Sequence, residues 1–235
     1  MQAGETSIGL SIARDGSFRM LAEPLAFRDP VHFRSFARSR LFRVMAAGQA
    51  KRDGIFPVAA AYAGQQALLS KKPIASLEDF KGMRVRSFSK TLFPALGAKA
   101  VSLPLAEVKP ALDRSVVDAA ETLPTLISSL KWPEAARNLY LTGFVTETVL
   151  FSVQSKAWSA LPPETRKEVG MWISKAAEAC SRANYDAESR ALKELESKGV
   201  RVFPFDAAKV RARLPAPKGG PGWTAGTWNE LQALK

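Results

Sequence analysis

The sequence predicts an α/β fold with a parallel or mixed sheet, and two observations carry this prediction. Between residues 83 and 119, short strand-like segments alternate with short helices, as they do in βαβ units. The second observation is a helical pattern from Pro163 to Lys198 that contains no further proline and a single glycine, Gly170. At about 1.5 Å per residue this helix would be about 54 Å long, which exceeds the width of one small domain. We therefore expect it to bridge two lobes.

The segment from Gly82 to Glu121 holds the clearest pattern of the chain. Its expected strands are Met83–Ser87, Ala100–Leu103 and Val116–Ala119, and its expected helices are Ser89–Leu96 and Leu105–Arg114. Arg86 lies at the carboxyl end of the first of these strands, just before a helix begins. Ligands in open α/β sheets bind at the carboxyl ends of strands, and a helix N-terminus favours an anion. Arg86 is therefore a candidate anion-binding residue.

The rest of the chain supplies further strands and helices. Upstream we expect a helix end at Gln2–Gly4, strands at Thr6–Ile12, Gly54–Tyr62 and Gln65–Ser70, a helix at Pro30–Gln49, and a short helix capped by Ser76 and Asp79. Downstream we expect helices at Thr122–Leu130 and Asp206–Arg213, strands at Asn138–Leu141, Glu147–Gln154 and Val200–Pro204, and a loop or tail at Leu214–Trp223.

Composition narrows the function classes. The 235 residues, 46% of them hydrophobic, suffice for one large or two small domains with a sizeable core. One cysteine, Cys180, excludes an internal disulfide framework, and we expect it to be an inert packed thiol. One histidine, His32, gives little support to a catalytic or metal site, and a solvated or capping role is expected. The start, MQAGETSIGL, has no visible signal peptide, and no apolar run reaches the roughly 18 residues of a membrane span.

Several motifs together resemble one known family. The run SKKPIASLEDFKGMRVRSFSKTLFPALGAKAVSLPLAEVKPALDRSVVDAAET is followed by YLTGF and by SKAWSALPPETRKEV, which leads into the long helix. This arrangement resembles the DctP-type solute-binding proteins of TRAP transporters, and the similarity covers roughly Gln2 to Asp206. The resemblance implies a periplasmic, non-enzymatic receptor that needs no cofactor or metal. It also implies a carboxylate-bearing small-molecule ligand that the receptor delivers to the membrane permease subunits.

The resemblance also implies a fold, the two-lobed periplasmic-binding-protein fold with hinge crossovers and one long bridging helix. The expected first lobe comprises residues 1–63 and 152–191, and the expected second lobe comprises 64–151 and 192–235. The family's leading strand, helix and strand look absent, so the first lobe is expected to be incomplete at its N-terminus.

Five residues are expected at the ligand site on the strength of the resemblance. Arg86 matches the family arginine that holds the ligand carboxylate, and a planar fork suits that task because it can form two parallel charge-assisted bonds. Gln66 stands where many members carry a second arginine, Leu105 where an aromatic residue is frequent, and Thr122 where an asparagine is usual. Phe144 is expected to line the cleft. These departures imply a ligand whose polarity differs from that of sialic acid or simple C4-dicarboxylates.

Neighbouring charged residues are expected to have structural or solvent-facing roles. Arg84 shares a strand face with Arg86 by alternation but is expected to be solvated. Glu107 and Asp118 are expected to be helix and turn residues.

Three alternatives remain open from the sequence. The net charge of +12 fits nucleic acid as well as anionic ligands, although no run of five or six basic residues occurs. The altered site residues also fit a degenerate paralogue that no longer binds solute. Finally, Ser87-Phe88-Ser89-Lys90 matches the S-x-x-K pattern of serine β-lactamases, without the supporting S-D-N or K-T-G motifs.

Overall fold

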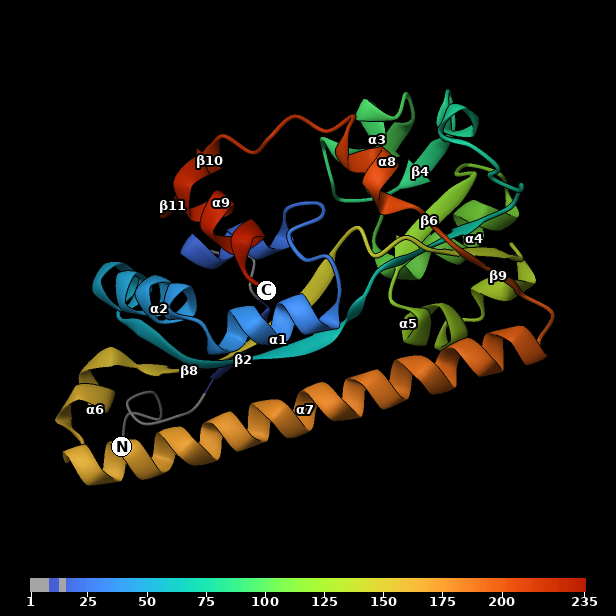
Figure 1. The fold of residues 1–235 in the computed structure, drawn as a ribbon. Coiled ribbons are helices and arrows are strands. Elements are labelled where there is room, and N and C mark those ends of the chain that lie inside the picture. Colours follow the sequence, from blue (N-terminus) through green and yellow to red (C-terminus); the bar gives the residue numbers. More distant parts are fainter. Residues whose placement is uncertain (1–8, 13–15) are drawn as a thin grey trace. The chain divides into compact units, whose positions relative to one another are not determined.

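The chain folds into two compact units that share the sequence in alternating segments. The structure, a computed structural model, describes residues 9–12 and 16–235 (Figure 1). The first unit comprises residues 1–64, 146–185 and 217–235, and the second comprises 65–145 and 186–216. The expectations for Gln2–Gly4 and for the start of Thr6–Ile12 lie outside the described residues. Residues 217–235 were expected in the second lobe, and their place in the first unit corrects that expectation.

A three-stranded sheet organises the first unit, in the order β1 (Gly9–Ile12), β8 (Thr146–Gln154) and β2 (Ile55–Gln65). The pairing of β1 with β8 is antiparallel, and Gly9 lies opposite Ser152. Along β8 buried residues alternate with half-buried ones through most of the strand, because successive side chains point to opposite faces of a sheet. Phenylalanines from the helices that follow β1, including Phe18, Phe33, Phe36 and Phe42, form the core with Tyr62 of β2.

The helix expected at Pro30–Gln49 is two helices, α1 (Pro30–Arg38) and α2 (Arg40–Asp53). Ser39 separates them with an extended backbone (φ −74°, ψ 164°). Its side-chain oxygen accepts a hydrogen bond from the Phe42 N–H (3.0 Å), while its own N–H donates to the Phe36 carbonyl (2.9 Å). Ser39 thus ends one helix and caps the next, a role that serine performs well because it competes with the helical backbone for hydrogen bonds.

The C-terminal segment contains structure that the sequence did not predict. A two-stranded ribbon, β10 (Gly219–Gly220) and β11 (Trp223–Thr224), leads into α9 (Ala225–Ala233). Trp223 of the ribbon and Trp228 and Leu231 of α9 are buried in the first unit's core. Their apolar side chains therefore explain why the end of the chain joins the first unit rather than forming a loose tail.

His32 corrects the expectation of a solvated residue. Only 1% of it is exposed, and its Nε2 lies 2.8 Å from the Leu231 carbonyl of α9. Its Nδ1 accepts a hydrogen bond from the Arg28 N–H (3.2 Å), so Nε2 carries the proton that Leu231 accepts. The capping residue of α1 is Asp29, whose carboxylate accepts from the His32 N–H (2.8 Å). His32 therefore ties the end of α9 to the start of α1.

A six-stranded sheet organises the second unit. Its order is β5 (Lys99–Val101), β4 (Arg84–Arg86), β6 (Ala119–Thr122), β3 (Ala67–Ser70), β7 (Asn138–Leu141) and β9 (Arg201–Pro204). The pairs β4–β5, β4–β6 and β7–β9 are parallel, whereas β3 runs antiparallel to both of its neighbours. All residues of β3 and β6 are buried, as expected for the middle of a sheet covered on both faces. The prediction of a mixed α/β sheet is confirmed.

The second unit also contains the helices α3 (Leu92–Ala95), α4 (Val108–Asp113), α5 (Pro124–Ser129) and α8 (Ala207–Arg211). Short 3-10 helices lie at Leu77–Phe80, Leu105–Glu107 and Trp132–Glu134. The strand expected at Val116–Ala119 begins later, at Ala119. The N–H groups of Val116 and Val117 both donate to the Ala111 carbonyl at the end of α4 (2.8 and 3.3 Å), so these residues belong to a turn and not to the sheet ladder. The predicted cap of the short helix Leu77–Phe80 is confirmed, because Ser76 and Asp79 form a capping box.

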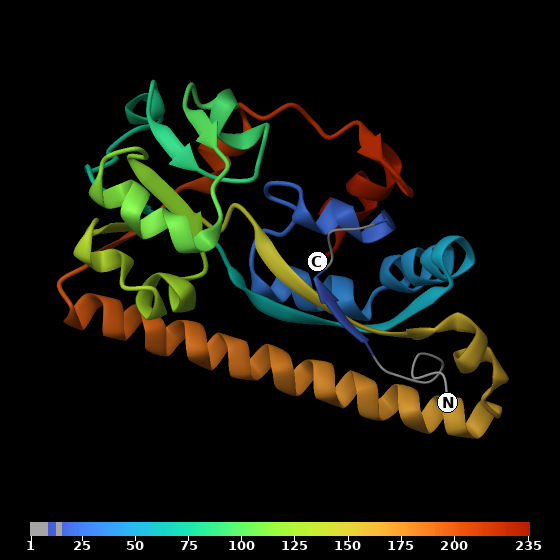
Figure 2. The same cartoon turned by 180° about the vertical axis from the view of Figure 1, so that it is seen from behind.

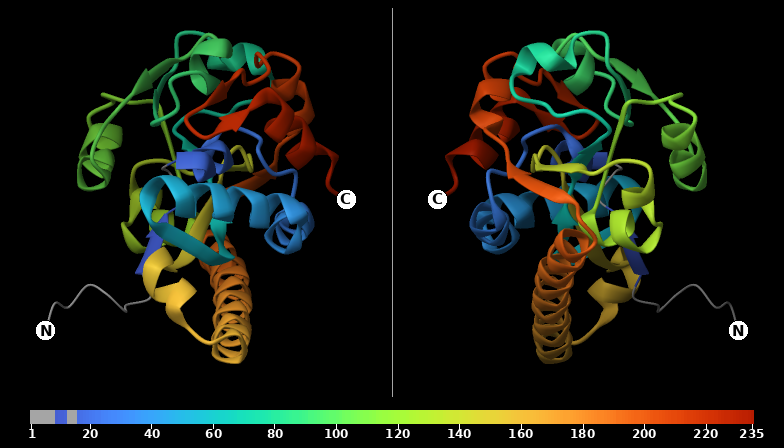
Figure 3. Two further views of the ribbon diagram at one scale, coloured as in Figure 1. Left: turned by 90° about the vertical axis from the view of Figure 1, so that its left-hand side faces the viewer. Right: turned by 90° about the vertical axis from the view of Figure 1, so that its right-hand side faces the viewer.

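The long helix is confirmed as α7 (Pro163–Ser197), which contributes residues through Tyr185 to the first unit and the remainder to the second. In the first unit, α6 (Ser155–Ala160) lies beside the first turns of α7 (Figure 3). The Trp158 ring of α6 lies next to Gly170 of α7. Cys180 is partly buried and packs against the cluster of Ile173 and Ala177. In the second unit, α5 lies against the last turns of α7 (Figure 2). Of the helices in the described ranges, none has the length and apolar character that crossing a membrane requires.

Candidate functional site

The candidate site lies where three parallel strands of the second unit end. The register pairs Arg86 of β4 with Val101 of β5 and with Ala120 of β6, so the carboxyl ends of these strands meet at one edge of the sheet. Arg86 is the last residue of β4 and is only 5% exposed. A guanidinium so deeply buried is unusual, because charged groups enter a protein interior only where polar partners receive them.

Main-chain oxygens from both neighbouring strands hold the Arg86 guanidinium in place. Its Nε donates to the Leu103 carbonyl just beyond β5 (3.1 Å), and its Nη1 donates to the Glu121 carbonyl of β6 (3.0 Å). The Phe88 ring lies against the guanidinium, with 4.4 Å from Cζ to the ring centroid. Two hydrogen bonds and one cation–π contact therefore orient the fork before any ligand arrives.

Beside Arg86, the Ser87 hydroxyl donates a hydrogen bond to Oε1 of Glu121, a residue that is only 4% exposed. The same hydroxyl accepts from the Ser89 N–H (2.9 Å). Among the described residues, no hydrogen bond joins Ser87 to Lys90, whose side chain is exposed. A hydroxyl that donates to a carboxylate and is not hydrogen-bonded to the lysine does not show the nucleophile arrangement that the S-x-x-K pattern requires.

Gln66 and Thr122 lie at the same edge as Arg86. Thr122 is the last residue of β6 and pairs with Ala67, the first residue of β3, so Gln66 comes directly before that pair. The Gln66 backbone is held by hydrogen bonds from its N–H to the Val145 carbonyl (2.9 Å) and to its carbonyl from the Gly143 N–H (3.2 Å). The antiparallel register thus brings together two of the residues that the sequence placed near Arg86.

Leu105 and Phe144 both pack against other side chains of the second unit. Leu105 is half-buried and packs against the second unit's core. Phe144 has no exposed surface, because its ring packs against those of Phe93 (6.2 Å between centroids) and Phe205 (5.4 Å). Phe144 was expected to line a cleft, whereas the structure places its ring inside an aromatic cluster of the second unit.

Arg84 was expected to be solvated, and 42% of its side chain is exposed, but it is also paired with Asp118. Its Nε donates to Oδ2 of Asp118 (3.0 Å) and its Nη2 to Oδ1 (2.7 Å), while the Arg84 main-chain N–H also donates to Oδ2 (2.9 Å). Asp118, the residue just before β6, is therefore structural, as predicted, and it connects β4 to the start of β6. Hydrogen bonds from Arg84 lower the pKa of Asp118 below its ordinary value of 3.8.

This pair predicts how stability should respond to acid. A carboxyl with a lowered folded-state pKa stabilises the fold above its ordinary pKa, and that contribution disappears as the pH falls through the folded-state value. We expect Asp118→Asn to lower the melting temperature at pH 7 and the difference from the wild type to shrink progressively below about pH 4. Thermal unfolding followed by circular dichroism from pH 7 to pH 3 measures this. A constant difference across that range would contradict an ionised pair.

Two contacts of the site were not predicted from the sequence. Phe88 entered the sequence analysis only as part of the S-x-x-K motif. In the structure its ring, 56% exposed, lies against the Arg86 guanidinium. An aromatic residue two positions after a strand-end arginine was the available signal, since residues at that spacing share a face. Glu121 gave no such signal, because burial of its carboxylate depends on strands remote in sequence.

Comparison with known proteins places the chain in a family. The family model for bacterial extracellular solute-binding protein, family 7 (DctP), matches residues 4–214. A solute-binding protein of Roseobacter denitrificans is 25% identical over 197 residues, which cover 82% of this chain and 61% of that protein. The chain thus spans about three fifths of the length of that relative.

Solved structures show the same fold. A TRAP periplasmic solute-binding protein of Rhodobacter sphaeroides in an open, ligand-free form superposes with a TM-score of 0.89 at 20% identity, covering 97% of this chain and 80% of that one. Another from Roseobacter denitrificans, solved with bound β-D-glucuronate, gives a TM-score of 0.79 at 23% identity over the same shares of the two chains. The predicted two-lobed fold class is therefore confirmed, and this chain belongs to the DctP family of bacterial extracellular solute-binding proteins.

Proposed function

We propose that the protein is the extracytoplasmic receptor of a TRAP-type transporter and that it binds a carboxylate-bearing sugar acid through Arg86. The observation that carries this proposal is the buried guanidinium at the carboxyl ends of β4, β5 and β6. An arginine whose orientation is fixed in advance loses little conformational freedom when a carboxylate binds, so more of the interaction appears as affinity. Membership of a solute-binding family supports the same reading.

Gln66 and Thr122 would then recognise the uncharged part of the ligand. An amide and a hydroxyl at the same sheet edge can donate and accept hydrogen bonds without adding charge, which suits the hydroxyl groups of a sugar. We therefore favour an acid with one carboxylate and several hydroxyls over a dicarboxylate. The glucuronate bound to the Roseobacter denitrificans protein is an acid of this kind. For Leu105 and Phe144 we propose packing roles behind the site, because Leu105 packs against the second unit's core and Phe144 lies inside an aromatic cluster.

The partners and the location that we propose for the receptor follow from the family to which the chain belongs. We propose that the receptor acts in the periplasm and passes its ligand to the membrane permease subunits, without catalysing a reaction. The family is one of solute-binding proteins, so the nucleic-acid-binding alternative has no support, and the basic surface is better explained by attraction of anionic solutes.

Isothermal titration calorimetry with a panel of small molecules tests this proposal. We expect D-glucuronate or D-galacturonate to bind with micromolar or better affinity, and glucose and galactose to show no heat, because the neutral sugars differ only in having a hydroxymethyl group in place of the carboxylate. A succinate arm separates sugar acids from dicarboxylates. Equal binding of acids and neutral sugars would contradict the arginine-based site, and binding of no acid would favour the degenerate-paralogue alternative.

A further inference from the structure

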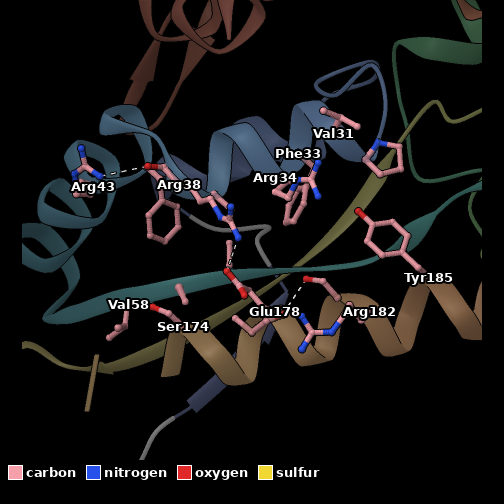
Figure 4. A pocket seen from close by; sticks show the side chains of 17 residues that line it. Val31, Phe33, Arg34, Arg38, Arg43, Val58, Ser174, Glu178, Arg182 and Tyr185 are labelled. Atoms are coloured by element: carbon pink, nitrogen blue, oxygen red, sulfur yellow. Dashed lines mark hydrogen bonds and ion pairs between the residues drawn. The ribbon is translucent and has the colours of Figure 1, made fainter. Parts of the chain in front are cut away.

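The first unit contains a groove that plays no part in the proposed receptor site. It has a volume of about 550 Å³ and lies between α1, the outer strand β2 and the first-unit part of α7 (Figure 4). All of its lining residues belong to the first unit, whereas Arg86, Gln66 and Thr122 belong to the second. Pockets that hold small organic ligands have volumes of about 300–1,000 Å³, so this groove is of the right size for one.

Charge along the groove is strongly positive. Arg34 and Arg38 of α1, Arg43 of α2 and Arg182 of α7 line it, with Glu178 as the one carboxylate among the lining residues. Glu178 already pairs with Arg38 (2.6 Å). Neither Arg34 nor Arg182 forms an ion pair or hydrogen bond with any other residue in the described part of the chain, and they come from opposite walls of the groove, α1 and α7 (Figure 4). Within the described residues, two guanidinium groups without a paired carboxylate therefore lie on the two walls of the groove.

The floor of the groove is apolar. Phe33, Phe42, Ala60 and Ala177 line it and are almost fully buried, and the Tyr185 ring stacks on Tyr62 (4.1 Å between centroids) next to the same surface. An apolar floor below a cationic rim matches a molecule with an apolar body and an anionic group, since the body gains from burial and the anion from arginine.

An extended peptide is a weaker candidate, although β2 is an outer strand of its sheet. Strand addition requires main-chain groups that are open to the incoming chain. At Tyr62 these groups are already engaged by α7, because the Tyr62 N–H donates to the Ser181 hydroxyl (3.0 Å) and the Tyr62 carbonyl accepts from the Asn184 amide (2.9 Å). Side chains of α7 therefore block the main chain of β2 at Tyr62 from pairing with a docking peptide.

We propose that this groove is a second binding site, which takes a small amphiphilic anion such as an aromatic sulfonate or carboxylate. The apolar body lies on the floor formed by α1, β2 and α7. The anionic group lies between Arg34 and Arg182, and the Arg38–Glu178 pair closes the rim beside it.

Fluorescence titration with 1-anilinonaphthalene-8-sulfonate tests the site, and N-phenyl-1-naphthylamine, the same molecule without the sulfonate, serves as the neutral probe. We expect the sulfonate to bind with one-to-one stoichiometry. The double variant Arg34→Gln/Arg182→Gln should weaken its binding about tenfold or more and leave the neutral probe unaffected. Both positions are exposed, so the variant should fold. Ser174→Trp, on the α7 wall, should reduce binding of both probes by obstructing the groove.

The matched control is Arg40→Gln/Arg190→Gln, which removes the same charge from exposed arginines outside the groove and should leave the sulfonate affinity within about twofold. Equal loss in both double variants would mean that the probe responds only to net charge, and no loss in the groove variant would place it elsewhere; either result overturns the proposal. Binding of an alternating Glu-Val decapeptide, without binding of either small probe, would identify a strand-docking edge and would overturn it too.

Discussion

Arg86→Ala should reduce the affinity for the acid ligand by about thirtyfold or more. Removing one partner of a buried, hydrogen-bonded charge pair costs about 2–5 kcal/mol, and each 1.4 kcal/mol is a factor of ten in affinity. Alanine also leaves the carbonyls of Leu103 and Glu121 without the donors that Arg86 supplies. Calorimetry with the tightest-binding sugar acid of the panel measures the loss.

Arg86→Lys separates charge from geometry in the same experiment. Lysine keeps the positive charge but has a single ammonium group, which cannot reproduce the planar fork. We therefore expect an affinity between those of the wild type and the alanine variant. Arg114→Ala, which removes an exposed arginine of the same unit, is the control and should bind normally. If the lysine and alanine variants both bind like the wild type while remaining folded, Arg86 does not hold the carboxylate.

The sequence predicted well those helices whose ends are fixed by residues close to them in the chain. Pro163 and Gly199 enclose α7 because proline suits the first turn of a helix, while Gly199 adopts the left-handed conformation (φ +80°) at its end. Gly97 likewise ends the α3 segment with φ +80°. Helical periodicity over 35 residues is a strong pattern, and no tertiary contact was needed to recognise it.

Contacts between distant segments explain what the sequence left unpredicted. His32 is buried because its ring meets the Leu231 carbonyl, 199 positions further along the chain. Arg84 was expected in solvent because its partner, Asp118, is separated from it by 34 residues and an intervening helix pair. The helix break at Ser39 also depends on packing. One serine in an otherwise helical pattern is not enough to predict a cap, and the break follows from the contact between the Phe36 and Phe42 rings on either side of it.

The candidate site, too, was predicted from the sequence only in part. Arg86 could be found from the sequence because a strand end followed by a helix is a local pattern. Its orienting groups could not, because main-chain oxygens of Leu103 and Glu121 carry no sequence signal and come from two other strands. Residue identity therefore revealed the charged group, whereas only the strand order β5-β4-β6 revealed what fixes its direction.

Trp132→Ala should cause the largest loss of stability among single substitutions considered for this chain, about 3–5 kcal/mol. Trp132 is fully buried in the second unit's core, where it packs with residues such as Val108, Leu112 and Leu139. Truncation to alanine removes most of that contact and leaves a cavity that a core built from rigid strands cannot fill. Urea unfolding followed by circular dichroism measures the change in the free energy of unfolding.

Trp132→Phe should cost much less than Trp132→Ala, and the comparison tests the reason. The indole Nε1 is buried, and the described residues provide it with no hydrogen-bond partner. Phenylalanine removes this unsatisfied donor while keeping an aromatic ring, so part of the lost packing is offset by the removal of a buried polar group that costs about 1–3 kcal/mol. Trp172→Ala is the control, because that side chain is 57% exposed on α7 and should change stability by less than about 0.5 kcal/mol. If phenylalanine proves as costly as alanine, the indole N–H has a partner that stabilises the core, and the stability of the second unit depends on that hydrogen bond as well as on packing.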